Sequence, residues 1–208
     1  SAGLIAIYLP MHTATRLAIE VLPKIKNLNS SAHLAFYGLY ATINKDLLRS
    51  LGGKTIISGE FEDSLVQLYQ QLVGSTFVSD SGLVSLKRQN FRKPKRSDLP
   101  NLNHYAKLIN GKAQSITVGY TEGTRGCKHI CRHCPIVPVY NGRFFVVQPE
   151  VVMDDIRQQV EAGAEHITFG DPDFFNGPGH ALRLVKSFHQ EFPNLTYDVT
   201  IKVEHLLA

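Results

Sequence analysis

The chain of 208 residues contains no tryptophan, two methionines and only three cysteines. The cysteines all lie between Cys127 and Cys134, and an odd number so closely spaced excludes a disulfide framework. This cysteine usage is typical of a reducing compartment, so we predict a cytoplasmic protein. No run of about 18 apolar residues occurs, and no signal peptide is recognisable at the N-terminus. The sequence therefore predicts neither a membrane span nor a membrane partner.

The net charge is also small: 22 basic and 18 acidic residues leave an excess of only +4. This excess does not by itself indicate nucleic acid as a partner, and we do not expect one. Hydrophobic residues make up 43% of the chain, which excludes wholesale disorder. Six basic residues fall within residues 87–96. We interpret this run as a solvated linker lying on an acidic neighbour, with phosphate or nucleic-acid binding as the alternative.

Both ends of the sequence indicate a fragment of a longer protein. The chain has no initiator methionine and enters an apolar run at Leu4 almost at once. It stops at Leu206, Leu207 and Ala208, which again lie inside an apolar run. We therefore expect further sequence on both sides.

Apolar segments of strand length alternate with helical patterns in two separate regions, which predicts an α/β fold with two parallel sheets. The predicted strands cover residues 4–9, 33–37, 54–58, 116–120, 166–169 and 197–203. The predicted helices cover residues 13–28, 43–51, 62–72, 149–162 and 179–192. The resulting domain prediction is a first domain over 1–73, a basic linker over 74–112 and a second domain over 113–208.

The three cysteines form the strongest motif, with three residues between Cys127 and Cys131 and two between Cys131 and Cys134. Three thiolates suit a 4Fe-4S cluster whose fourth iron stays open to another ligand. A structural zinc site needs four ligands and would have to recruit His129 or His133. The loop follows a predicted strand, so it lies at the carboxyl edge of a parallel sheet, where such folds carry their sites.

The Cys-x3-Cys-x2-Cys loop resembles that of the radical S-adenosylmethionine (SAM) superfamily. Residues 132–143, 166–176 and 202–207 are similar to a narrower group, the radical SAM proteins named for a CUAEP or CCAEP tail. This resemblance covers essentially the whole chain, although the tail itself is not in the sequence. It implies an incomplete cobalamin-binding-type Rossmann-like domain followed by the N-terminal half of a radical SAM partial β/α barrel.

The resemblance implies which residues serve SAM. The three cysteines would bind the cluster, the open iron would chelate SAM, and His133 would lie near the adenine. Gly170, Asp171 and Asp173, which end the predicted strand over 166–169, would contact SAM. Their alternative interpretation is an ordinary turn. Lys202 and Glu204 share a face of the last predicted strand, where they would meet SAM, form an ion pair with each other or face the surface.

The turns that follow the first three strands suit a flat cofactor with a long tail, and the resemblance implies cobalamin there. The candidate residues are His12, Thr13, Gly38, Leu39, Gly59 and Glu60. No cobalt ligand is assigned, because the Asp-x-His-x-x-Gly motif is absent from the sequence. The alternative is a degenerate Rossmann-like domain without a cofactor.

The favoured hypothesis is therefore a radical SAM enzyme that generates a 5′-deoxyadenosyl radical, with cobalamin-dependent methylation of an unactivated carbon. Its implied partners are a small-molecule or peptide substrate and a one-electron reductant such as flavodoxin or ferredoxin. No catalytic residue beyond the cofactor ligands is assigned. The alternatives are a radical SAM enzyme without cobalamin or methyl transfer, and a zinc- or cluster-stabilised interaction module that uses the basic linker as its contact surface.

Overall fold

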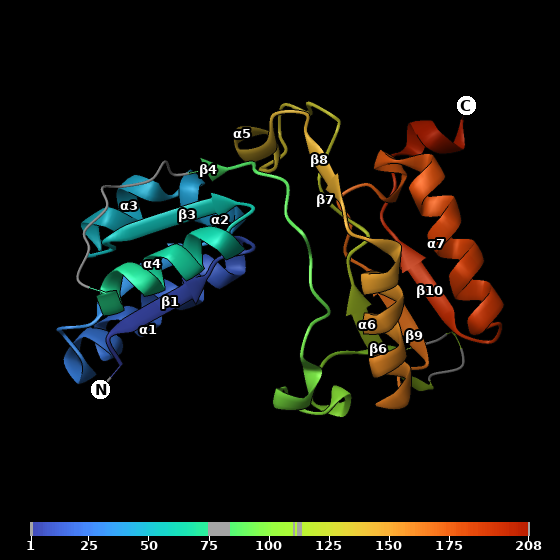
Figure 1. Cartoon of the computed structure of the whole chain (residues 1–208), viewed down its shortest axis with the longest axis horizontal. Helices are drawn as coiled ribbons and strands as arrows, with labels where there is room; N and C mark the ends of the chain where they lie inside the picture. The colour runs from blue at the N-terminus through green and yellow to red at the C-terminus, as the bar shows by residue number, and fades with distance from the viewer. Residues whose placement is uncertain (1, 75–83, 110, 112–113, 208) are drawn as a thin grey trace. The chain divides into compact units, whose positions relative to one another are not determined.

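The computed structural model describes residues 2–74, 84–109, 111 and 114–207 (Figure 1). Residues 75–83, 110 and 112 of the predicted linker lie outside the described residues, as do 1, 113 and 208. The chain forms two compact units, one from Ser1–Gln89 with His129–Asn141 and one from Asn90–Lys128 with Gly142–Ala208. The first unit therefore includes the second half of the cysteine loop. No helix of the described residues is both long and apolar enough to cross a bilayer.

The first unit is built on a parallel sheet with the strand order β1-β2-β3-β4. Its strands are β1 (Leu4–Tyr8), β2 (His33–Tyr37), β3 (Thr55–Gly59) and β4 (Val84–Ser85). Its helices are α1 (His12–Leu28), α2 (Leu39–Ile43), α3 (Lys45–Ser50), α4 (Glu62–Gly74) and α5 (Val137–Tyr140). The sheet confirms the α/β class predicted for this part of the chain.

Alternation along the strands sends side chains to two cores. Phe36 and Ile56 pack in a cluster that contains residues of α1, α2 and α3, whereas Ala35 and Ile57 pack against Leu68 of α4. Because successive strand residues face opposite sides, the helices cover both faces of the sheet. Both faces are therefore buried, which explains why these strands are nearly continuous apolar runs.

The helix predicted over 43–51 is wrong in its bounds. The structure has two short helices there, and α2 begins at Leu39, directly after β2. Gly38 makes the abrupt turn possible with a φ of 102°, a conformation that favours glycine. Asn44 separates the helices, and its side-chain amide donates to the carbonyl of Tyr40 at 2.8 Å. That side-chain bond offers the backbone an alternative to helix continuation.

The second unit contains a sheet with the order β10-β9-β6-β5, in which only β5 runs antiparallel to its neighbour. Its strands are β5 (Lys107–Ile109), β6 (Ser115–Thr121), β9 (His166–Phe169) and β10 (Thr196–Val199), with a separate hairpin of β7 (Thr124–Gly126) and β8 (Phe144–Val146). The helices are α6 (Pro149–Glu161) and α7 (Pro178–Glu191). Short 3-10 turns are η1 (Arg96–Asp98), η2 (Leu102–His104), η3 (Phe174–Asn176) and η4 (Val203–Leu206). The arrangement is a half-barrel sheet, as predicted.

The two faces of this second sheet differ in character. Ile167 and Phe169 of β9 belong to the buried cluster formed with α6 and α7. Thr168, between these two residues, points to the opposite face of the sheet. Its register partners Tyr120 and Asp198 on the neighbouring strands share that face. The helix-covered face is apolar, and the opposite face carries hydroxyl and carboxylate groups.

The last strand is shorter than predicted. The sequence favoured a strand over 197–203, but β10 ends at Val199 and Lys202 caps the 3-10 turn η4. The carbonyl of Thr200 instead accepts a hydrogen bond from the backbone N–H of Phe174, at 2.8 Å. The hydrogen bond from Phe174 therefore takes the place of the strand pairing that was predicted at Thr200.

Candidate functional site

Asp171 holds the turn between β6 and β7, from which the cysteine loop departs. Its carboxylate accepts from the backbone N–H of Gly123 at 2.9 Å and from the hydroxyl of Thr124 at 2.6 Å. The side chain is 2% exposed, and burial raises its pKa although these hydrogen bonds oppose the rise. Asp171 is therefore held by the protein itself, as the turn interpretation expects.

The start of the cysteine loop is clamped by one amide side chain. Asn176 accepts from the backbone N–H of Lys128 at 3.0 Å and donates to the carbonyl of Gly126 at 3.0 Å. The backbone N–H of Cys127 donates to the carbonyl of Arg143 across the β7–β8 hairpin, at 3.0 Å. Cys127 is thus buried on a well-supported backbone. No sequence pattern indicates this role of Asn176, which lies 48 residues from Lys128.

The second half of the loop belongs to the first unit. Cys131 and Cys134 are half-buried, and the backbone N–H of Cys134 donates to the carbonyl of Cys131 at 3.1 Å. His133 between them is exposed. No disulfide joins the three cysteines, all of which lie in the described part of the chain. All three cysteines therefore carry thiols and are candidate metal ligands.

Tyr140, at the end of α5, fixes this half of the loop beside β3. Its hydroxyl donates to Glu60 at 2.9 Å, and both side chains are buried, Glu60 completely. Glu60 follows β3 at the edge predicted for cobalamin. Within the first unit, the segment after Cys134 is therefore joined to that edge.

Replacing Tyr140 with phenylalanine should weaken this junction. The variant keeps the ring but removes the donor to a buried carboxylate, which we expect to destabilise the first unit by about 1–2 kcal/mol. The measurement is the urea midpoint of unfolding. Tyr69→Phe, at a position on α4 that is 59% exposed, serves as the matched control and should change little. Equal midpoints for the two variants would contradict the account.

The other residues predicted to bind SAM lie in the second unit, at the end of β9 and in η4. Asp173 is 1% exposed, accepts from the backbone N–H of Phe175 and lies 3.0 Å from Nε2 of His205. Lys202 and Glu204 form an ion pair at 2.9 Å, which was one of the interpretations left open. Because β10 has already ended, their predicted placement on one strand face is wrong.

Gly170 is the position at this strand end where a side chain has no room. A Cβ there would overlap the hydroxyl and ring of Tyr120, which crosses over the glycine backbone. Tyr120 also donates from its hydroxyl to Glu122 at 3.1 Å, and burial is the main reason that the pKa of Glu122 is raised. Tyr120 is a site residue that sequence reasoning missed.

A hydrogen-bonded cluster on the polar face of the second sheet was also missed. Asp198 accepts from Thr168 at 2.7 Å and lies 2.8 Å from Nε2 of His166. Burial would raise the pKa of Asp198, but these hydrogen bonds outweigh it and the pKa is lowered. Alternate polar residues in the strands over 166–169 and 196–199 were the available sequence signal.

The predicted cobalamin residues all lie at the carboxyl edge of the first sheet. His12 and Thr13 begin α1 and are exposed, Gly38 and Leu39 begin α2, and Gly59 and Glu60 end β3. The sheet thus brings the three turns to one edge, because parallel strands end together.

Three aromatic side chains gather at the same edge of the first sheet. The ring of Tyr8 stacks on Tyr37 with centroids 5.1 Å apart, and Phe61 lies 5.0 Å from Tyr37 and 5.7 Å from Tyr8. Tyr8 remains 47% exposed. The signal in the sequence is an aromatic residue at or just beyond each of the three strand ends.

The buried carboxyl of Asp171 gives a prediction for the pH dependence of stability. A carboxyl whose pKa is raised by folding stabilises the protonated folded state, so its contribution is lost as pH rises through the folded pKa. The unfolding free energy of the wild type minus that of Asp171→Asn should therefore fall as pH rises from about 4. Urea unfolding across pH measures it, with the exposed Asp98→Asn as the control. A difference that stays constant or grows with pH would contradict the burial argument.

The fold has solved counterparts. The chain superposes on two structures of the radical S-adenosylmethionine methyltransferase TsrM from Kitasatospora setae, one with tryptophan substrate and a SAM analogue and one with cobalamin and a [4Fe-4S] cluster. The TM-scores are 0.73 and 0.66, at 16% and 15% identity, over 94% of this chain in both cases. The chain spans 42% and 43% of the length of those two chains.

No protein-family model matches the sequence, and no curated protein matches it either. At this level of identity the structural likeness establishes the fold. The chain thus has the Rossmann-like domain and the partial β/α barrel that were predicted.

Proposed function

We propose that this chain is the cofactor-binding part of a radical SAM enzyme, with Cys127, Cys131 and Cys134 as the ligands of a 4Fe-4S cluster. The observation that carries the proposal is the Cys-x3-Cys-x2-Cys loop leaving the carboxyl end of a parallel half-barrel sheet. The residues fit such a group, because no disulfide consumes the thiols and Asn176 fixes the backbone at the first of them.

The chemistry that the cofactors supply when bound is one-electron reduction of SAM, which yields methionine and a 5′-deoxyadenosyl radical for hydrogen abstraction from carbon. The chain's own residues would position and shield it. Gly170, whose Cβ side is already covered by Tyr120, would contact SAM through its backbone, and Asp171 and Asp173 would contact SAM while they rigidify the strand end. His133, Lys202 and Glu204 complete the proposed set around SAM.

Cobalamin-dependent methylation is the finer part of the proposal. One of the two TsrM structures carries cobalamin. In this chain the Tyr140–Glu60 hydrogen bond joins the cysteine loop to the sheet edge formed by His12, Thr13, Gly38, Leu39, Gly59 and Glu60. The exposed ring of Tyr8 adds an apolar surface there. A purified full-length protein that retains a corrin chromophore would support this part, and one that binds no added cobalamin would leave a radical SAM enzyme without methyl transfer.

The partners and the location follow from the same proposal. A one-electron reductant such as flavodoxin or ferredoxin would supply the electron, the substrate would be a small molecule or peptide, and the protein would act in the cytoplasm. The likeness to proteins with a CUAEP or CCAEP tail remains a prediction, which the sequence beyond Ala208 tests directly.

The test of the proposal is metal analysis after anaerobic reconstitution with iron and sulfide. We expect about four irons and four sulfides per chain, with an electron paramagnetic resonance signal that SAM alters. One zinc per chain and no iron would instead establish a zinc-stabilised interaction module. That outcome would overturn the proposal.

A further inference from the structure

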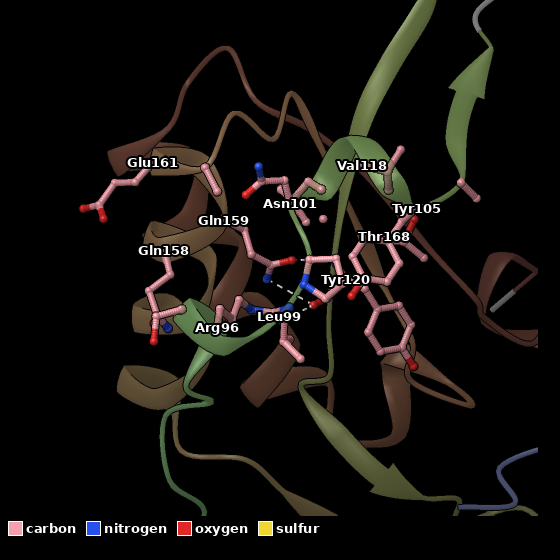
Figure 2. A pocket seen from close by; sticks show the side chains of 16 residues that line it. Arg96, Leu99, Asn101, Tyr105, Val118, Tyr120, Gln158, Gln159, Glu161 and Thr168 are labelled. Carbon is pink, nitrogen blue, oxygen red and sulfur yellow. Dashed lines mark hydrogen bonds between the residues drawn. The ribbon is translucent and has the colours of Figure 1, made fainter.

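The strand that leads into the cysteine loop is fixed before the loop begins. The buried amide of Gln159 accepts from the backbone N–H of Tyr120 on β6 at 2.7 Å and donates to its carbonyl at 3.0 Å (Figure 2). Asp171 then holds the turn between β6 and β7. The chain therefore reaches Cys127 on a backbone that is supported at several points.

Lys128, directly after the first cysteine, is held by the turn η3 through both its backbone and its side chain. Its backbone N–H donates to the side chain of Asn176 at 3.0 Å, and its ammonium group donates to the carbonyl of Phe175 at 3.0 Å. The side chain is half-buried. Because both contacts are with adjacent residues of one turn, the ammonium group has a defined place next to the cysteine loop.

The charge of this ammonium group is not neutralised by a carboxylate. Within the described residues of the chain, Lys128 contacts a neutral carbonyl and forms no ion pair. Asp173, which caps the same turn, lies 3.0 Å from Nε2 of His205 instead. A full positive charge therefore remains on the residue that follows the first thiol.

The backbone N–H groups at the start of the loop are already engaged. The N–H of Cys127 donates to the carbonyl of Arg143, and that of Lys128 donates to Asn176. The reduction potential of an iron–sulfur cluster depends on net charge, on hydrogen bonds to its sulfurs and on solvent exposure. Because neither N–H is available to a sulfur, charge is the main influence that these two residues can exert on a cluster.

We propose that the ammonium group of Lys128 raises the reduction potential of the cluster and so favours its uptake of an electron. The assignment rests on the proposed function, because it requires a cluster at the three cysteines. In this step the one-electron donor is oxidised, the cluster gains one negative charge, and no bond or proton is exchanged. A fixed positive charge nearby stabilises the more negative state.

Lys128→Met removes the charge and keeps an unbranched side chain. We expect reduction of the reconstituted cluster to become about tenfold less favourable, which lowers its midpoint potential by about 59 mV for one electron. Lys128→Gln, a second neutral variant, should give a similar shift. Lys128→Arg keeps the charge and should leave the midpoint close to that of the wild type. The measurement is an anaerobic potentiometric titration without SAM, followed by the electron paramagnetic resonance signal of the reduced cluster.

Lys107→Met is the matched control. Lys107 is exposed and pairs in register with Thr117 near the start of β6, whereas the cysteine loop follows the other end of that strand. Water and salt screen its charge over that distance, so the midpoint should not change.

Iron content and midpoint potential together decide the outcome. Full iron content with an unchanged midpoint in the two neutral variants would overturn the assignment, and so would an equal shift in Lys128→Arg. Loss of iron in both neutral variants would overturn it as well, because Lys128 would then hold the loop in place instead of tuning the cluster. Wild-type protein that takes up no iron would overturn the proposed function itself, so the two failures are distinguishable.

Discussion

Cys127→Ala should lower the iron content of the reconstituted protein from about four atoms per chain to less than one. The cluster needs all three thiolates because no fourth cysteine exists to replace a lost one. Cys131→Ala and Cys134→Ala should behave in the same way. Iron and sulfide analysis, with the visible absorbance of the cluster, is the measurement.

The histidines of the loop provide the control for this result. His129→Ala and His133→Ala should retain the iron, because the cluster is held by sulfur alone. A zinc site would depend on one of them, since three cysteines leave one of its four positions open. Loss of metal in a histidine variant, together with bound zinc, would contradict the cluster.

Arg96→Ala should destabilise the second unit by about 3 kcal/mol, because it leaves the carboxylate of Asp155 buried without its partner. The side chain of Asp155 is 4% exposed and that of Arg96 24%. The variant also removes the hydrogen bond from Arg96 to the carbonyl of Tyr120. The urea midpoint of unfolding is the measurement.

Lys95 gives a matched control one position away. It pairs with Asp98 at 2.8 Å, but the two side chains are 77% and 67% exposed. Water and salt screen such a pair, so Lys95→Ala should change the midpoint little. Similar midpoints for Arg96→Ala and Lys95→Ala would show that the Arg96–Asp155 ion pair does not stabilise the second unit.

Arg96 also illustrates what the sequence could predict about the basic run. A run of six cations, with Pro94 and Pro100 bracketing its end, indicated a linker against an acidic neighbour, and Arg96 does bind a buried aspartate. Which cation does so was not predictable, because the partner lies 59 residues away and meets it only in the folded structure. The predicted linker over 74–112 also contains the edge strand β5, which has only three residues and therefore leaves no clear pattern in the sequence.

The strands of the first sheet were predictable because they are buried on both faces and end at turns. Gly38 and Gly59, for example, both adopt positive φ at strand ends. The β7–β8 hairpin was missed, since each strand has three residues and a chain of 17 residues, containing the cysteine loop, separates them. Periodicity also overextended the strand that became β10, because Ile201 and Val203 continue the alternation after the ladder has stopped.

The candidate site was predictable only where chemistry is local. The three cysteines fall within eight consecutive residues, so their spacing can be seen directly in the sequence. Asn176, Tyr120 and Tyr140 act through contacts with residues 20 or more positions away or on other strands, and their residue types alone carry no such information. For Asp171 the contact with SAM stays a prediction, and in the structure its carboxylate binds the β6–β7 turn.

The most direct test of the central claim is the formation of 5′-deoxyadenosine from SAM by the full-length protein, reconstituted with iron and sulfide under anaerobic conditions and reduced with dithionite. The account predicts 5′-deoxyadenosine and methionine in equal amounts, and none from Cys127→Ala. Failure of a fully iron-loaded wild-type protein to cleave SAM would contradict it.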